Sequence, residues 1–258
     1  TFFFSAVSEM FIKTPYKEEA SHLGDDETEK ASFSDAIAHI KSIKGFGSLL
    51  VSILFINFAV SPLFSVGIVY LFNNILVKPA MDLAITNVVF SASTLIAGIV
   101  IGAIKLKSSG ATIRRFIALL TLGFILISIN IALVMNGITS YPVFYILTLV
   151  LNLFMGVTII FVNVPLNTGM TKVIAPSYRG RVFSLTGALS QIAMPVSLIL
   201  SGFVIDNFGI VSLAGVCSFL AIIPTVVFIM NKNLRHLFEG IDHANSKDHP
   251  EPIATEAV

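Results

Sequence analysis

The chain has 258 residues, of which 55% are hydrophobic and only 12% are charged, and its mean hydropathy is +0.89. Soluble proteins carry about 25% charged residues, so this composition excludes an ordinary soluble domain. The net charge of +1 comes without a basic patch that has interleaved aromatic residues, which argues against nucleic-acid binding. The single cysteine, Cys217, and five histidines without ligand spacing argue against a disulfide, a metal site or a metal cofactor.

The N-terminal residues predict the end of a membrane helix followed by a polar linker. Residues 1–12 read TFFFSAVSEMFI, which is typical of the last turns of a transmembrane helix, so we expect the sequence to be a fragment. A signal peptide would need a basic flank and a cleavage site of small residues, and neither is present. Residues 13–45 predict a cytoplasmic linker with a short amphipathic helix at 32–45, and for 13–31 a disordered linker is an equal alternative.

Five stretches without a charged side chain follow the linker. A helix needs about 20 apolar residues to cross a membrane, and the third stretch is long enough for two helices. The sequence therefore predicts an all-α membrane protein with six transmembrane helices, at 46–73, 83–104, 114–136, 141–166, 181–204 and 208–230.

The cations of the chain are segregated when these spans are threaded alternately through a bilayer. Of the 16 Lys and Arg residues, only Lys78 falls on the outer side. Because Lys and Arg near span ends are retained in the cytoplasm, we expect both termini to be cytoplasmic in a multi-pass protein of the cell membrane. The segment 232–258 is polar and predicts a cytoplasmic disordered tail.

Polar side chains form a stripe on the first and fourth predicted spans. At about 100° per residue, each set falls on one face of its helix. An amide facing lipid would lack hydrogen-bond partners, so the stripes must face protein or water. They predict either the wall of a substrate cavity or hydrogen bonds between helices, and the residues are Asn57, Ser61 and Ser65 on the first span and Asn152, Asn163 and Asn167 on the fourth.

Prolines mark predicted helix breaks. Pro62 interrupts the first span, Pro165 ends the fourth, and Pro195 interrupts the fifth. The first and fourth spans also begin two successive triplets of helices, and proline-interrupted spans at matching places in two repeats point to a transport site. Proline is common in transmembrane helices in general, which weakens this pointer.

Short loops carry the remaining candidate residues. Arg179 and Arg181 at a helix N-terminus oppose the helix dipole, so we expect an anionic partner, either a lipid phosphate or a carboxylate. Gly180 allows a tight approach, and Asp206 precedes a tight outer turn that ends at Gly209. The loop after the second span is the strongest cytoplasmic anchor, and it contains Lys105, Lys107, Gly110, Arg114 and Arg115.

Four segments carry a resemblance to a known family: FSDAIAHIKSIKGFGSLL, SPLFSV, APSYRGRVFSL and GFVIDNFG. The chain resembles the C-terminal half of a major facilitator superfamily transporter, spans seven to twelve, in the branch of macrolide-efflux and enterobactin-exporter proteins. The resemblance runs from about residue 1 to residue 238. The signature inner loop of the superfamily carries an Asp between its glycines, and residues 102–115 here have none.

The resemblance implies an exporter of amphipathic drug-like or siderophore-like molecules that works with a missing N-terminal six-helix half. Membrane lipid and a small-molecule substrate are the other expected partners. No ionisable side chain lies inside the spans, with Asp206 at a span end, so we expect any proton-coupling residue to lie in the other half. A six-span scaffold without transport activity is the alternative. A membrane-embedded enzyme is disfavoured because the spans lack His, Asp and Glu as general bases or metal ligands and the inner loops carry only Arg and Lys.

Overall fold

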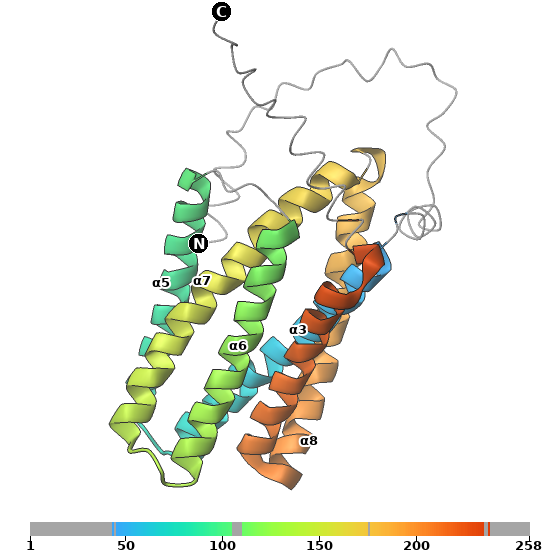
Figure 1. Ribbon diagram of the computed structural model, residues 1–258. Coiled ribbons are helices and arrows are strands. Elements are labelled where there is room, and N and C mark those ends of the chain that lie inside the picture. The colour runs from blue at the N-terminus through green and yellow to red at the C-terminus, as the bar shows by residue number, and fades with distance from the viewer. Residues whose placement is uncertain (1–42, 44, 105–109, 175, 235–236, 238–258) are drawn as a thin grey trace, which may run out of the picture.

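The computed structural model describes residues 43, 45–104, 110–174, 176–234 and 237, and all regular structure within them is helical. Almost all predictions for residues 1–45, and those for the tail beyond 237, lie outside these residues. The helices are α3 (Phe46–Ser61), η2 (Pro62–Gly67), α4 (Ile68–Tyr70), η3 (Leu71–Ile75), α5 (Ala80–Ile104), α6 (Gly110–Met135), α7 (Tyr141–Val173) and α8 (Pro176–Met230) (Figure 1).

Within the described residues, five helices are long and apolar enough to cross a membrane. The segments α3, η2, α4 and η3 join into one of them, with two π-helical stretches in its second half. Large apolar side chains such as Leu95, Ile199 and Ile229 lie exposed on the outside of the bundle. An apolar exterior of this kind fits contact with lipid. The five spans are Phe46–Ile75, Ala80–Ile104, Gly110–Met135, Tyr141–Thr171 and Tyr178–Met230.

The last of these is a helical hairpin with two arms. A straight helix of 53 residues would be about 80 Å long at 1.5 Å per residue, far more than a hydrocarbon core of about 30 Å. The chain reverses at Gly209, which has φ 77° and ψ 174°. Residues on both sides of the turn, Ser201 and Cys217 among them, line one small cavity, so the arms run antiparallel (Figure 1). The predicted turn is therefore present, but the predicted gap at 205–207 is helical, and exposed Asp206 lies in the last turn before it.

Two apolar clusters hold the helices together. Helix α5 packs on α7, α7 on α6, α6 on α8 and α8 on α3. The first cluster includes Phe72, Phe124 and Phe144, all fully buried. The second cluster includes Phe46 and Ile117. Leu234 and Leu237, which the sequence assigned to the tail, are also buried in the second cluster.

Helix α6 and the second arm of α8 meet along a line of hydroxyl groups, here called the hydroxyl seam. Thr121 Oγ1 donates to the carbonyl of Ala221 at 2.8 Å and lies 2.7 Å from Thr225 Oγ1. Seven residues further along α6, Ser128 Oγ donates to the carbonyl of Ala214 at 2.8 Å and lies 2.6 Å from Ser218 Oγ. Each hydroxyl therefore has a partner on the facing helix, as a polar group in an apolar bundle requires.

Several helix ends differ from the prediction. Helix α7 continues past Pro165 to Val173, and α8 continues through the exposed Pro195, because a proline removes one donor while the rest of a membrane helix keeps its hydrogen bonds. The predicted breaks at these prolines are therefore wrong. Helix α6 begins at Gly110 rather than 114, and α8 begins at Pro176 rather than 181, because helices extend beyond the apolar stretch that crosses the membrane.

One charged cluster joins the beginnings of α5 and α7. Tyr141 donates a hydrogen bond to the carboxylate of Asp82, and the ammonium of Lys78 lies 4.2 Å from the centre of the Tyr141 ring. Tyr145 donates to the backbone carbonyl of Asp82 at 3.3 Å. The lone cation of the predicted outer side thus lies over the aromatic ring whose hydroxyl donates to Asp82.

Candidate functional site

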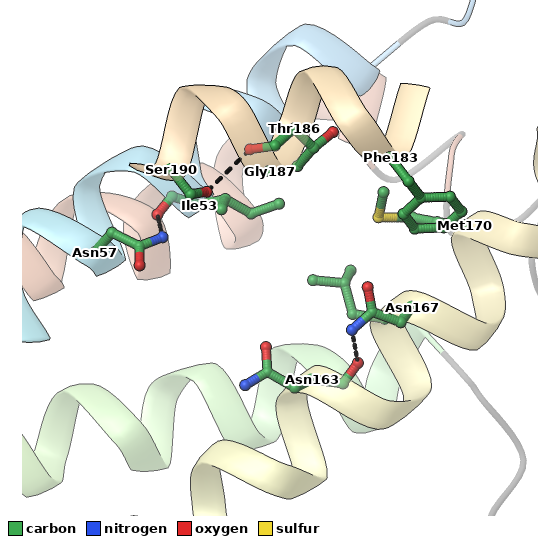
Figure 2. A pocket seen from close by; sticks show the side chains of 10 residues that line it. Ile53, Asn57, Asn163, Asn167, Met170, Phe183, Thr186, Gly187 and Ser190 are labelled. Carbon is green, nitrogen blue, oxygen red and sulfur yellow. Dashed lines mark hydrogen bonds between the residues drawn. The ribbon is translucent and has the colours of Figure 1, made fainter. Parts of the chain in front are cut away.

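A pocket of about 310 Å³ lies between α3, α7 and the first arm of α8 (Figure 2). This volume is at the lower end of the range of about 300–1,000 Å³ for ligand pockets. A smaller cavity of about 120 Å³ adjoins it and shares Ile53, Asn57, Asn163 and Leu166. The lining residues of the larger pocket are Ile53, Asn57, Asn163, Leu166, Asn167, Met170, Phe183, Thr186, Gly187 and Ser190.

Three of the asparagines singled out from the sequence meet in this pocket. Asn57 comes from α3, while Asn163 and Asn167 come from α7. Figure 2 shows their amides on opposite sides of the same space. The stripes on the first and fourth predicted spans therefore face one another at these three asparagines, although the two helices are far apart in the sequence.

The stripe on α7 is open along only part of its length. Asn152 is 4% exposed, and its amide donates to the carbonyl of Thr148 at 2.9 Å. One turn later, a Cβ on Gly156 would collide with Ser93 Oγ and lie 2.9 Å from the carbonyl oxygen of Phe90. Helix α5 thus covers the stripe at Gly156, whereas Asn163 and Asn167 are exposed. Asn152 is a buried packing residue and not part of the pocket.

The stripe on the first span also changes along its length. Ser61 is half-buried and Ser65 is exposed, and neither lines the pocket. At Pro62 the helix becomes π-helical, with more residues per turn than an α-helix. Ser65 lies beyond this point along the span, outside the pocket. Pro62 does mark an irregularity of the helix, as the sequence predicts.

Helix α8 supplies a third wall that the sequence analysis missed. Phe183, Thr186, Gly187 and Ser190 line the pocket, and their spacing of three, four and seven residues places them on one face of a helix. That spacing was visible in the sequence. The polar stripes predicted from the sequence lie on the first and fourth spans, and the hydroxyl groups of the fifth span are not among them.

The loop residues lie away from the pocket. Arg179 Nε donates to the carbonyl of Ile174 at 3.0 Å, directly after α7. The negative end of the α7 dipole is thus one partner of this arginine, and the expected lipid phosphate or carboxylate stays a prediction. Arg181 and Arg115 are exposed, Arg114 is half-buried, and a Cβ on Gly180 would meet nothing within 4 Å, so no tight approach requires this glycine.

The described residues that line the pocket carry no ionisable group. Within the described part of the chain, no three His, Cys, Asp or Glu side chains gather into a metal site. The pocket can therefore recognise a molecule by shape, apolar contact and neutral hydrogen bonds.

Comparison with known proteins finds relatives that are efflux proteins. Macrolide efflux protein A of Streptococcus pyogenes is 29% identical over 179 residues, which cover 68% of this chain and 41% of that protein. Macrolide efflux protein A of Enterococcus faecalis is 29% identical over 167 residues, which cover 64% of this chain and 48% of that protein. The chain thus spans less than half the length of these relatives.

These relatives confirm the resemblance to macrolide-efflux proteins that the sequence motifs indicate. With its long apolar helices, the chain is a multi-pass membrane protein. No protein-family model matches the chain. No solved structure matches it either.

Proposed function

We propose that this chain forms one six-helix half of a twelve-helix major facilitator transporter that exports amphipathic drug-like molecules. The observation that carries the proposal is the meeting of Asn57, Asn163 and Asn167 in one uncharged pocket. Polar side chains in a membrane bundle are favourable only where they find partners or line a cavity. The two arms of α8 and the four other long helices supply the six spans of such a half.

A second six-helix half would supply the opposite wall of the cavity. Transporters of this kind rock two helical bundles around a binding site near the middle of the membrane. The pocket opens between helices that belong to a single bundle, so a facing bundle would enclose it and alternate its access. The relatives are more than twice as long as the parts that match this chain, which supports the presence of such a half.

The residue that couples export to an energy source would lie outside this wall of the cavity. A carboxylate that loads and releases a proton must sit in a cavity, whereas Asp206 is exposed beside a turn and Asp82 is held by Tyr141. We infer that coupling to protons uses a residue of the other half. The distribution of Lys and Arg supports an orientation in the cell membrane with both termini in the cytoplasm.

Drug accumulation in cells tests this function. The full-length protein that contains this chain is expressed in a strain that lacks its own efflux pumps, and uptake of a macrolide and of other lipophilic drugs is measured with and without a protonophore. We expect lower accumulation than in vector controls, and the protonophore should remove the difference. Accumulation equal to the vector control for every drug would refute export and favour the scaffold alternative.

Substitutions of asparagine by leucine test whether export depends on the pocket. Asn57→Leu and Asn163→Leu should raise accumulation to near the vector level because they remove amides from the cavity wall. Asn207→Leu is the matched control, since Asn207 is exposed outside the pocket and its amide donates to the carbonyl of Phe203 at 2.8 Å, much as Asn57 donates to Ile53. Equal export by all three variants at equal expression would place the site elsewhere.

A further inference from the structure

Four of the five polar side chains that line the pocket share one hydrogen-bond pattern. Asn57 Nδ2 donates to the carbonyl of Ile53 and Asn167 Nδ2 to that of Asn163, both at 2.9 Å. Thr186 Oγ1 donates to the carbonyl of Val182 at 2.9 Å, and Ser190 Oγ to that of Thr186 at 3.1 Å. In each case the side chain donates to the carbonyl four residues earlier in its own helix.

This pattern leaves the pocket rich in acceptors. A hydroxyl group has a single hydrogen, so Thr186 and Ser190 have none left to offer a ligand. The oxygens of Asn57 and Asn167 receive no hydrogen bond within the described residues, and Figure 2 shows them turned toward the space between the helices. Each of these two amides keeps one further N–H, and the amide of Asn163 makes no hydrogen bond in the described part of the chain.

We propose that this wall recognises neutral hydroxyl groups on an amphipathic molecule, so that it prefers a vicinal diol or sugar-like face to an ether. The inference rests on the proposed function and names the substrate class of the same pocket. A hydroxyl donates to the free oxygens and accepts from the remaining amide N–H groups, so both sets find partners. An ether cannot donate, and it leaves these acceptors unpaired.

Phe183 and Met170 line the same pocket and supply apolar contact for the rest of the molecule. The preference therefore concerns the polar face of the ligand and not its apolar body.

Two fluorescent probes test the preference on the full-length protein in lipid nanodiscs. They are a dansyl amide that carries a 1,2-diol and its dimethyl ether. We expect the diol to bind about tenfold more tightly than the ether, as for one or two hydrogen bonds. Equal affinity for the diol and the ether would overturn the proposal.

Two variants assign the preference to α8. Thr186→Val and Ser190→Ala remove acceptor oxygens whose hydrogens are bound to their own helix, so folding should be retained. Together they should reduce the diol-to-ether ratio to about twofold or less. Thr168→Val is the matched control, because exposed Thr168 donates in the same way to Val164 at 2.9 Å but does not line the pocket. A ratio unchanged in the double variant would also overturn the proposal.

Export of the same probes from cells separates this inference from the proposed function. Export of the diol and the ether at equal rates would uphold a transporter and refute the hydroxyl preference. If the full-length protein bound and exported no probe or drug, the proposed function would fail and the preference would fail with it.

Discussion

The hydroxyl seam between α6 and α8 and the pocket between α3, α7 and α8 both place polar side chains inside apolar helices, yet their hydrogen bonds differ. In the seam, Thr121 and Ser128 donate to carbonyls of the facing helix and touch hydroxyls there. In the pocket, Asn57 and Asn167 donate only to their own helices. The hydroxyl groups of the seam are hydrogen-bonded across the two helices, whereas the amide oxygens of the pocket remain available to accept hydrogen bonds from another molecule.

The comparison shows that a polar residue in an apolar helix is not by itself a sign of a binding site. Interhelical hydrogen bonds between Ser, Thr and Asn are common in membrane bundles and contribute only about 0.6 kcal/mol on average. What separates the two regions is the presence of a neighbouring helix over the polar face. A variant that fills the pocket should therefore change drug efflux. Variants that crowd the covered stripe on α7 or break hydrogen bonds in the seam should change the stability of the protein.

The largest expected effect comes from filling the pocket. Gly187 lines it, and a Cβ at this position would meet nothing within 4 Å, so Gly187→Leu should fold normally and occupy the cavity. We expect drug efflux to fall at least about a hundredfold, equivalent to about 2.7 kcal/mol, with an unchanged melting temperature. Gly202→Leu on the same helix, also without neighbours within 4 Å, is the control. Normal efflux by Gly187→Leu would remove the pocket from the mechanism.

An intermediate effect is expected where α5 covers the stripe on α7. A side chain at Gly156 meets the backbone of Phe90, so Gly156→Ala should destabilise the protein by about 2 kcal/mol. Gly98→Ala on α5 meets nothing within 4 Å and should stabilise by up to about 1 kcal/mol through helix propensity. Thermal unfolding in detergent measures both. Changes of the same sign and size would mean that α5 does not close the stripe.

The smallest effect is expected in the hydroxyl seam. Thr121→Val and Thr225→Val should each cost about 1 kcal/mol because each removes the hydrogen bond between the two hydroxyl groups. A double-mutant cycle should give a coupling of about 0.6 kcal/mol, with efflux unchanged throughout. Loss of efflux at constant stability would show that the seam, too, takes part in transport and would end the distinction between the two regions.

Hydropathy and charge predicted the apolar helices well, but not where they end. The charge-free stretches located the cores of all the long helices. Helix α7 nevertheless extends to Val173, because its end depends on hydrogen bonds after the apolar stretch, such as that of Arg179 to Ile174. Hydropathy measures only the part of a helix that lies in lipid, so it underestimates helices that project from the membrane.

The pocket was predictable only in part, because a helical stripe does not reveal what lies over it. The spacing of Asn163 and Asn167 identified the open part of α7, but the same stripe includes Asn152, which is buried. On the first span, Ser65 does not line the pocket, although it belongs to the same predicted stripe as Asn57. Which neighbour covers a face depends on tertiary packing, and irregular turns change the angle per residue on which the prediction depends.

The reversal of α8 at Gly209 has a consequence for how the chain enters the membrane. A helical hairpin can insert as one unit, and its turn carries a single ionisable side chain, Asp206, whereas its open end carries Arg179, Arg181 and Lys232. Moving a charged residue to the bilayer centre costs about 2.5–3.5 kcal/mol on insertion scales. Moving the Gly209 end across the membrane therefore costs less free energy than moving the open end. We infer that the charges of the hairpin itself favour one orientation of the last two spans.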